Sequence, residues 1–322
     1  MIPPDIFLPF IPLLIFGLAL MIDLIVGEPP DKLHPSVWMG KTIRLLKSKI
    51  KNKNPKIERL TGVLLALSTT ALFVAPVYLI LPLIHRYLGV VAYVIVAAIL
   101  LKPTFALTGM EFYTLPIAQA VEKGRINQAR KLLPYIVGRN PKNLNEQQII
   151  SATIESIGES NVDGITSPFF YFALFGVPGA IAYRVINTLD SMVGHKDPEN
   201  INIGWFSAKL DTVANYVPSR LTALLMIVAA WLLRKDWKSA WKILQRDKNN
   251  TESLNSGWCM SAIAGALNVK LQKPDFYTLG DDVNPLSPEN ISEALNIMKL
   301  TSFLFGLLVI IPILITVSRI AI

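Results

Sequence analysis

Cysteine, histidine and charge are all scarce in this chain of 322 residues. The one cysteine, Cys259, permits no internal disulfide and fits no multi-cysteine metal site. The three histidines, His34, His85 and His195, show no pairing at metal-ligand spacing, which argues against a zinc site. Charged residues make up only 17% of the chain and hydrophobic residues 52%, which is too apolar for an ordinary soluble enzyme of this size. A membrane protein is the first hypothesis.

Several nucleotide-binding and hydrolase motifs are also missing. Residues 40–42 read GKT, as at the end of a phosphate-binding loop, but the first glycine of that pattern would fall on Pro35, which has no backbone N–H. Neither a G-x-S-x-G nucleophile elbow nor a dinucleotide-binding glycine fingerprint occurs. The net charge of +8 comes without interleaved aromatic and basic residues. We therefore expect no nucleic acid partner, and we interpret the basic loops as facing anionic membrane lipid.

Long apolar runs are what the chain does have. A membrane helix needs about 20 mostly apolar residues, and four segments provide spans near 6–26, 62–84, 88–109 and 301–318. The first lacks the basic leader and the small-residue cleavage site of a secretory signal, so we expect a retained anchor. Segments 165–183 and 221–233 are ambiguous, because the first is broken by Pro178 and Gly179 and the second is short.

The positions of lysine and arginine predict the orientation. Most of them lie in loops that begin at Glu28, Lys102 and Arg234, which the positive-inside tendency places in the cytoplasm. The two ambiguous segments must then both cross or both not cross, which leaves six spans or four. We prefer four, with a broken or re-entrant hairpin at 165–187, since irregular backbone is tolerated at depth when protein or a water-filled cavity covers it.

The expected fold class is therefore all-α. We predict a polytopic integral membrane protein with four to six transmembrane helices and cytoplasmic helical loops. Residues 1–322 are expected to form a single integral membrane domain.

Acidic residues recur at four-residue steps just before an apolar segment. The stretch NLNEQQIISATIESIGESNV predicts a helix with Asn145 or a neighbour near its cap, and Glu155, Glu159 and Asp163 then share roughly one face. A solvated face would tolerate this, because like charges at that spacing cost only about 0.2–0.5 kcal/mol. The chain enters an apolar region directly after these residues, and burying unpaired carboxylates there would be costly, so a bound cation is favoured instead. Carboxylates with the Asn161 amide suit Mg²⁺, whose shell nucleotide phosphates would complete.

Other polar residues stand beside apolar segments in the same manner. One acidic residue at a membrane edge is commonplace, but so many Asp, Asn and Glu residues in that setting predict a shared polar cavity. The further residues of this kind are Asp23, Asn187, Asp190, Asp211 and Asn215.

Four blocks of sequence, in order over most of the chain, carry a family resemblance. They begin with DLIVGEPPDKLHPSVWMGKTI at Asp23, LLPYIVGRNPKNLNEQQIISATIESIGESNVDG at Leu132, GWFSAKLDTVANYVPSRLTA at Gly204 and SLNSGWCMSAIAGALNV at Ser253. Together they resemble the adenosylcobinamide-phosphate synthases, the CobD/CbiB-type integral membrane enzymes of cobalamin biosynthesis. The chain departs from the family pattern in SLNSG, where S-P-N is usual, and at Asp211, which is followed by threonine where the family usually has a second aspartate.

The resemblance implies an amide ligation in the cell membrane. Such enzymes join adenosylcobyric acid, through the propionate on ring D of the corrin, to aminopropanol or its O-phosphate, with ATP consumed. The partners implied are the corrinoid, the amine and membrane lipid, with ATP as cosubstrate and Mg²⁺ as cofactor. A carboxylate at neutral pH is a poor acyl donor, so ATP would convert it to an acyl phosphate, and Mg²⁺ would neutralise the phosphate charge. The number of protomers stays open, a homo-oligomer included.

Roles for particular residues follow from the resemblance together with their chemistry. Glu155, Glu159 and Asp163 are assigned to Mg²⁺ and the nucleotide. Asn187, Asp190 and Asp211 are candidates to join them or to act as base for the attacking ammonium, which must lose a proton first. The candidates for substrate binding are Asp23, Glu28, His34, Lys41, Asn161, Asn215, Arg220, Ser253, Asn255 and Gly257.

Purely structural roles for some of these residues stay open beside the functional ones. Glu28 and His34, with Pro29 and Pro35, would shape a tight turn after the first span. Ser253, Asn255 and Gly257 would cap the helix that follows them. Trp38, Trp205 and Trp258 would anchor the chain at the membrane interface.

Two other functions also stay open. One is a membrane transporter of corrinoids or other small molecules, and the other is a non-catalytic membrane sensor of the same fold. The lack of an internal repeat and the long polar loops favour an enzyme over a transporter. The acidic and asparagine motifs argue against a sensor, because a scaffold has little reason to bury so many charges.

Overall fold

The computed structural model of the protein describes residues 10–30, 32–138 and 140–320. Residues 6–9, at the start of the first expected span, lie outside the described residues. Regular structure in the described part of the chain is helical apart from two short antiparallel strands, β1 (Leu271–Lys273) and β2 (Tyr277–Leu279), in which Leu271 pairs with Leu279. The predicted all-α class is confirmed.

The helices belong to two compact units. The first unit comprises Met1–Ala106, Ser167–Ala214 and Leu308–Ile322, and the second comprises Leu107–Thr166 and Asn215–Leu307. The elements of the first unit are α1 (Ile11–Val26), α2 (Pro35–Ile50), α3 (Pro55–Leu101), the 3₁₀ turn η3 (Lys102–Thr104), α7 (Ser167–Val193), α8 (Trp205–Ala214) and α13 (Ile311–Ile320). The single membrane domain expected from the sequence stays a prediction.

The elements of the second unit are α4 (Leu107–Glu122), α5 (Ile126–Leu132), the 3₁₀ turn η4 (Leu133–Tyr135), α6 (Glu146–Asn161), the π-helix η5 (Val162–Thr166), α9 (Tyr216–Leu232), α10 (Trp237–Asp247), α11 (Ser256–Leu267), both strands and α12 (Pro288–Phe305). Within the second unit, helix α6 packs against α4, α5, α11, α12 and β1. A second π-helix, η6 (Gly306–Ile310), follows α12 and leads into α13. Asn145 caps α6 in a reciprocal capping box with Gln148, which confirms the predicted start of that helix.

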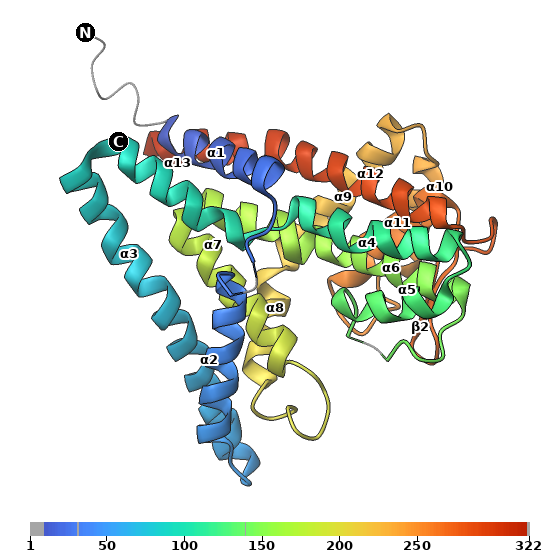
Figure 1. The fold of residues 1–322 in the computed structure, drawn as a ribbon, viewed down its shortest axis with the longest axis horizontal. Helices are drawn as coiled ribbons and strands as arrows, with labels where there is room; N and C mark the ends of the chain where they lie inside the picture. The colour runs from blue at the N-terminus through green and yellow to red at the C-terminus, as the bar shows by residue number, and fades with distance from the viewer. Residues whose placement is uncertain (1–9, 31, 139, 321–322) are drawn as a thin grey trace. The chain divides into compact units, whose positions relative to one another are not determined.

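Helix α3 is two helices joined by a sharp reversal at Gly89. Gly89 has φ +83°, a value that glycine adopts without steric cost. The rings of His85 and Tyr93 lie on either side of this break with centroids 5.3 Å apart, whereas eight residues of straight helix would rise about 12 Å. Figure 1 shows the chain turning back there, and the sequence predicted this turn between the spans at 62–84 and 88–109.

Helix α7 contains a second reversal. Gly176 has φ +66°, and the rings of Tyr171 and Tyr183 stack across it with centroids 5.3 Å apart. The broken hairpin predicted at 165–187 is thus confirmed, but its predicted position at Pro178 and Gly179 is wrong by two residues. Pro178 begins the second limb, where a missing N–H is harmless. A β-carbon on Gly179 would lie 2.5 Å from the carbonyl oxygen of Tyr171, so that glycine permits the close approach of the limbs.

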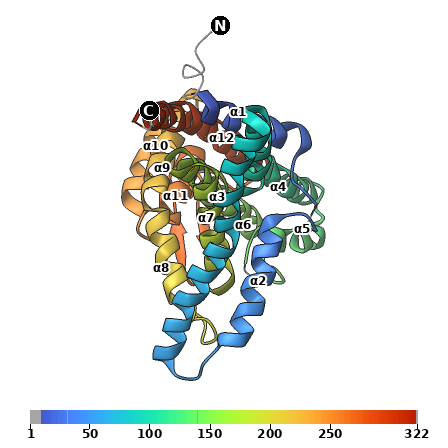
Figure 2. The same cartoon turned by 90° about the vertical axis from the view of Figure 1, so that its left-hand side faces the viewer.

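These hairpins form the framework of the first unit. Helix α3 packs against α1, α2, α7 and α8. Figure 2 shows α2 beside the first limb of α3, with α8 along the other side of that limb.

Three helical stretches are long and apolar enough to cross a membrane. They are Pro55–Glu122, Glu146–Val193 and Pro288–Val317, and α8 with α9 would make a fourth if that bent pair is one span. Large apolar side chains on α3, such as Leu64, Leu79 and Val91, are exposed, as expected of a surface that meets lipid. The chain is a polytopic helical membrane protein. Its candidate spans do not match the four predicted ones one for one, because 62–84 and 88–109 lie within a single stretch and Ile11–Val26 is a shorter apolar helix. The predicted number of spans stays a prediction.

A close contact between α3 and the loop before α8 generates a stability prediction. A β-carbon on Gly62 would lie 2.1 Å from the carbonyl oxygen of Ile203. We expect Gly62→Ala to cost about 1–3 kcal/mol, because the backbones must separate, and to lower the thermal unfolding midpoint in detergent. Gly17→Ala is the control, since a β-carbon at Gly17 meets nothing within 4 Å. Equal midpoints for the two variants would contradict the contact.

Candidate functional site

The predicted site residues divide between the two units. The first unit contains Asp23, Glu28, His34, Lys41, Asn187, Asp190 and Asp211. The second contains Glu155, Glu159, Asn161, Asp163, Asn215, Arg220, Ser253, Asn255 and Gly257.

A buried ionic cluster joins three segments of the first unit. The Nζ atom of Lys102 lies 3.0 Å from Asp23 Oδ1 and 2.9 Å from Glu28 Oε2. The Lys102 side chain is only 4% exposed and the Asp23 side chain is fully buried. Burying either charge alone would be very costly, so each needs its partner in place. The cluster therefore ties the end of α1 and the loop after it to the end of α3.

His34 extends this cluster to α2. Its Nδ1 atom accepts a hydrogen bond from the Ser36 backbone N–H at 3.1 Å, which caps α2. A neutral imidazole that accepts at Nδ1 carries its proton on Nε2, and Nε2 lies 3.4 Å from Glu28 Oε2. The Ser36 hydroxyl in turn accepts a hydrogen bond from Arg184 Nε on α7 at 3.1 Å. The expected turn-forming role of His34 and its contact with a polar cluster are thus both present.

The neighbours of Glu28 in the cluster shift the pKa of its carboxyl group. Burial alone would raise the pKa of this carboxyl group, but the His34 hydrogen bond and the Lys102 ammonium outweigh it, so the pKa of Glu28 lies below its ordinary value. Glu28 is therefore ionised at neutral pH.

Sequence reasoning missed Lys102 and Arg184 as members of this cluster. Lys102 is the first charged residue after the apolar run 87–101, and an isolated ionisable residue at the end of a span is a signal for function or pairing. Lys41, which was predicted, is instead exposed on α2.

The remaining candidates of the first unit lie on two helices that pack together. Asn187 and Asp190 are half-buried on the second limb of α7, and Asp211 is half-buried on α8. The chain turns tightly after α7, where the Gly194 N–H donates to the Asp190 carbonyl oxygen at 2.7 Å. A β-carbon on Gly194 would lie 2.0 Å from Asp190 Oδ1, so the side chain of Asp190 covers this turn.

In the second unit, Glu155 is a buried carboxylate that ties α6 to the two strands. Its Oε1 accepts from the Ser151 hydroxyl at 2.6 Å, and its Oε2 accepts from the Tyr277 hydroxyl at 2.8 Å. Ser151 Oγ also accepts from the Gln272 backbone N–H at 2.8 Å. Both oxygens of Glu155 therefore have protein partners, and sequence reasoning found neither Ser151 nor Tyr277, because they form the site only after folding.

Glu159, Asn161 and Asp163 occupy different surroundings at the end of α6. Glu159 is exposed, whereas Asn161 is fully buried and its Oδ1 accepts from the Ser302 hydroxyl at 2.9 Å. Asp163 is half-buried in the π-helix η5. A π-helix has wider turns than an α-helix and often occurs at functional sites. Asp163 consequently departs from the simple four-residue stripe that the sequence predicted.

Metal binding was assigned to Glu155, Glu159 and Asp163. Within the residues described, no three His, Cys, Asp or Glu side chains form a group that could hold a metal ion. Protein sites for Mg²⁺ commonly use one or two carboxylates and take the other oxygens from substrate phosphates and water. The carboxylates at the end of α6 fit only a site of this kind, in which phosphates and water supply the other ligands. The metal assignment stays a prediction.

Arg220 clamps α9 to the start of α11. One of its terminal nitrogens, Nη1, donates to Asn255 Oδ1 at 2.5 Å and to Ser219 Oγ at 2.9 Å. The guanidinium carbon lies 3.7 Å from the Tyr216 ring centroid and 4.7 Å from that of Trp258. A bidentate anion would have to share or displace these contacts, so the clamp first of all positions the start of α11.

The other candidates near α11 have structural roles. The Ser253 hydroxyl accepts from the backbone N–H groups of Asn255 and Ser256 at 3.2 and 3.3 Å, as predicted, whereas Asn255 stands at the cap position of α11 and makes no side-chain capping bond. A β-carbon on Gly257 would lie 2.3 Å from the Lys248 carbonyl oxygen, so only glycine fits there. Asn215 is buried and its carbonyl oxygen accepts from the Ser219 N–H, which opens α9.

The buried cluster generates a prediction for Lys102→Met. We expect a loss of about 3–5 kcal/mol in the free energy of unfolding, because the carboxylates of Asp23 and Glu28 stay buried without their shared cation. Lys51→Met is the control, since the Lys51 side chain is 47% exposed and its ion pair with Glu199 is worth at most about 1 kcal/mol. Unfolding is measured in detergent.

A double variant separates pairing from packing. Lys102→Met combined with Asp23→Asn should recover part of the loss, because one buried charge is removed with its partner. Strictly additive losses would contradict the ion pair as the source of stability.

Comparisons with known proteins place the chain in a family. The CobD/Cbib protein family matches residues 16–298. A protein of Methanothermobacter thermautotrophicus named "Probable cobalamin biosynthesis protein CobD" is 40% identical over 300 residues, which covers 92% of this chain and 97% of the relative. "Cobalamin biosynthesis protein CobD" of Dehalococcoides mccartyi is 42% identical over 280 residues, or 87% of this chain and 90% of the relative. The protein of that name from Clostridium perfringens is 35% identical over 88% of this chain and 92% of its own.

No solved structure matches the chain. The family match over residues 16–298 nevertheless includes every predicted site residue. The chain belongs to the CobD/CbiB family.

Proposed function

We propose that this protein acts in cobalamin biosynthesis as a multi-pass enzyme of the cell membrane. The reaction is the ATP-dependent ligation of adenosylcobyric acid with (R)-1-aminopropan-2-ol or its O-phosphate, which yields adenosylcobinamide or adenosylcobinamide phosphate. The observation that carries the proposal is the near full-length similarity, at 40% and 42% identity, to proteins named for cobalamin biosynthesis. The amide ligation itself rests on the resemblance of the four sequence blocks.

The chemistry has two steps that balance. A carboxylate oxygen of the corrinoid propionate attacks the γ-phosphorus of ATP, forming the acyl phosphate and releasing ADP. The amine nitrogen, after loss of a proton from its ammonium form, then attacks the acyl carbon, and phosphate leaves as the amide forms. The protein must therefore bind two anions close together and provide a proton acceptor near the amine.

The end of α6 supplies the donors for the nucleotide. Glu159 is exposed and Asp163 is half-buried in η5, so both can meet a ligand from solvent. Mg²⁺ bound with the nucleotide would neutralise charge on its phosphates. Glu155, whose oxygens are occupied by Ser151 and Tyr277, is a positioning residue that fixes α6 against the strands.

Residues of the first unit are proposed for proton acceptance. Asp190 and Asp211 are half-buried carboxylates on packed helices, and Asn187 lies one turn before Asp190. An ionised carboxylate beside the amine could accept the proton that the ammonium must lose before it attacks.

The reaction is tested on the purified protein in detergent. Adenosylcobyric acid, aminopropanol phosphate and Mg²⁺ are incubated with and without ATP, and the corrinoid is analysed by mass spectrometry. We expect an ATP-dependent mass gain that matches one amide condensation. A corrinoid that binds but stays unchanged in mass would contradict the ligase and would favour a transporter or a sensor.

Variants on α6 separate catalysis from positioning. We expect Glu159→Gln to lower kcat/KM for ATP at least about tenfold with an unchanged unfolding midpoint, because it removes charge from an exposed side chain. Glu155→Gln and Tyr277→Phe should instead lower the midpoint, because the amide keeps only one of the two oxygens that accept from Ser151 and Tyr277, and phenylalanine lacks the hydroxyl that donates to Glu155. Glu146→Gln, exposed on the first turn of α6, is the control. Normal ATP kinetics for Glu159→Gln would refute its role.

A further inference from the structure

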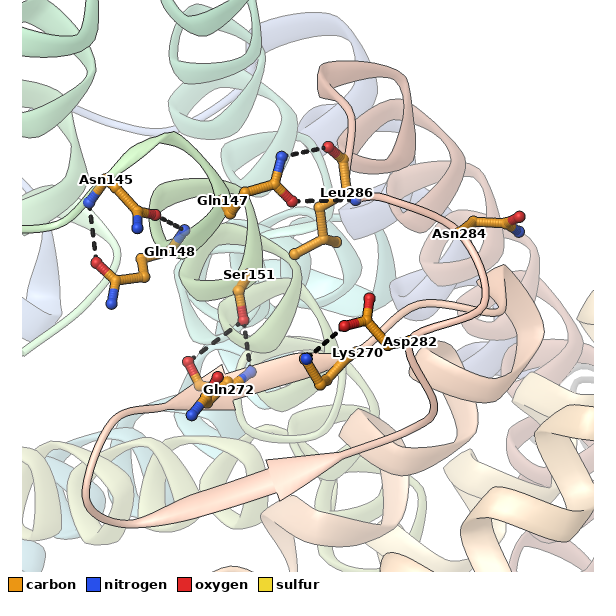
Figure 3. A pocket seen from close by; sticks show the side chains of 9 residues that line it. All are labelled: Asn145, Gln147, Gln148, Ser151, Lys270, Gln272, Asp282, Asn284 and Leu286. Atoms are coloured by element: carbon orange, nitrogen blue, oxygen red, sulfur yellow. Dashed lines mark hydrogen bonds and ion pairs between the residues drawn. The ribbon is translucent and has the colours of Figure 1, made fainter.

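A polar pocket lies within the second unit, apart from the residues that sequence reasoning selected. Figure 3 shows it between the first turns of α6, strand β1 and the segment 282–286. Its volume is about 250 Å³. Ligand pockets commonly measure about 300–1,000 Å³, so this pocket suits a small molecule. A corrinoid is far too large for this volume, whereas an amino alcohol phosphate fits.

The walls of the pocket are held by hydrogen bonds between elements. The Gln147 side chain donates to the Leu286 carbonyl oxygen at 2.9 Å and accepts from the Leu286 N–H at 3.1 Å. On the opposite side, Ser151 accepts from the Gln272 N–H at 2.8 Å. The pocket is therefore formed before a ligand arrives, which lowers the entropic cost of binding.

The segment that leads into the pocket is anchored by an ion pair. Asp247 Oδ2 accepts from the Gly280 N–H at 2.8 Å, and Arg246 donates to Asp247 and to Asp281. Burial alone would raise the pKa of Asp247, but the Arg246 and Gly280 hydrogen bonds lower it below its ordinary value. The carboxylate thus stays charged at neutral pH and fixes the chain just before Asp282.

Two opposite charges line the pocket and face each other. Figure 3 shows the Lys270 ammonium paired with the Asp282 carboxylate. Their side chains are 39% and 66% exposed, and an exposed pair contributes at most about 1 kcal/mol. Opening this pair therefore costs little. A ligand that carries both charges would replace one ion pair by two, whereas a ligand of single charge would leave one of the side chains without its partner.

We propose that this pocket binds the amine substrate, with its phosphate on Lys270 and its ammonium on Asp282. The proposal rests on the proposed function for the identity of the ligand. Ser151 joins the pocket wall to Glu155, since its hydroxyl donates to that carboxylate at 2.6 Å. Gln272, whose side chain is exposed at the pocket, adds an amide that can bond the phosphate oxygens. Lys270 and Asp282 are then substrate-binding residues.

Binding is measured without turnover. The full-length protein in detergent is titrated with 1-aminopropan-2-ol phosphate and, separately, with 1-aminopropan-2-ol, in the absence of ATP and corrinoid, by ligand-observed NMR. We expect wild type to prefer the phosphate ester. Lys270→Met should weaken binding of the ester about tenfold or more and abolish the preference, because the pair with the phosphate is lost. Asp282→Asn should weaken binding of both amines.

Matched controls lie in the same strand and its turn. Lys273→Met removes an equal charge from β1, and Asp275→Asn removes one from the turn, at a residue with φ +64° that asparagine tolerates. Neither residue lines the pocket. We expect affinities within about twofold of wild type for both. If Lys273→Met lost as much affinity as Lys270→Met, the loss would come from the overall charge of the protein and not from the pocket. That result would overturn the proposal.

Steady-state kinetics separate failure of the pocket from failure of the proposed reaction. If wild type makes the amide, Lys270→Met should raise KM for the phosphorylated amine about tenfold with kcat little changed. An unchanged KM would overturn the pocket and leave the ligase standing. If wild type makes no amide but binds the ester through Lys270, the reaction fails and the pocket stands.

Discussion

A charge buried among apolar residues needs a partner, and in the first unit the ends of several segments meet to supply one. The clearest case is Lys102, which stands between the carboxylates of Asp23 and Glu28 with almost no exposure. Because an unpaired buried charge costs several kcal/mol, the three segments that carry these residues must come together in the fold. His34 and Ser36 extend the same network towards Arg184. Glu155 follows the same rule in the second unit, through Ser151 and Tyr277.

The second constraint is that the two longest helices each reverse direction at a glycine. Gly89 and Gly176 reverse the chain at positive φ, so that α3 and α7 each fold back on themselves instead of continuing as one rod. Tyr171 on the first limb of α7 stacks on Tyr183 on the second limb and so joins the two limbs. Backbone groups left open at such breaks are tolerated at membrane depth only where protein or water satisfies them.

Features that depend on a few neighbouring residues could be predicted from the sequence. The Asn145 cap needs only Gln148, three residues later, and the turn near Gly89 is marked by the interruption of an apolar run. The sequence predicted the break in α7 at Pro178 and Gly179, whereas the backbone reverses at Gly176. Contacts between distant segments could not be predicted from local sequence patterns. Tyr277, for example, lies 122 residues from its partner Glu155. The pocket beside Lys270 was missed for the same reason, since its walls come from three separate stretches of chain.

The central claim is that the protein activates a carboxylate with ATP and passes the acyl group to an amine. The most direct measurement uses adenosylcobyric acid whose propionate carboxylate carries heavy oxygen, with mass spectrometry of the phosphate released during ligation. An acyl phosphate intermediate transfers one labelled oxygen from the carboxylate to the phosphate, and the account predicts label in that product at the same rate as amide formation. Unlabelled phosphate beside a labelled amide would contradict activation of the carboxylate by ATP.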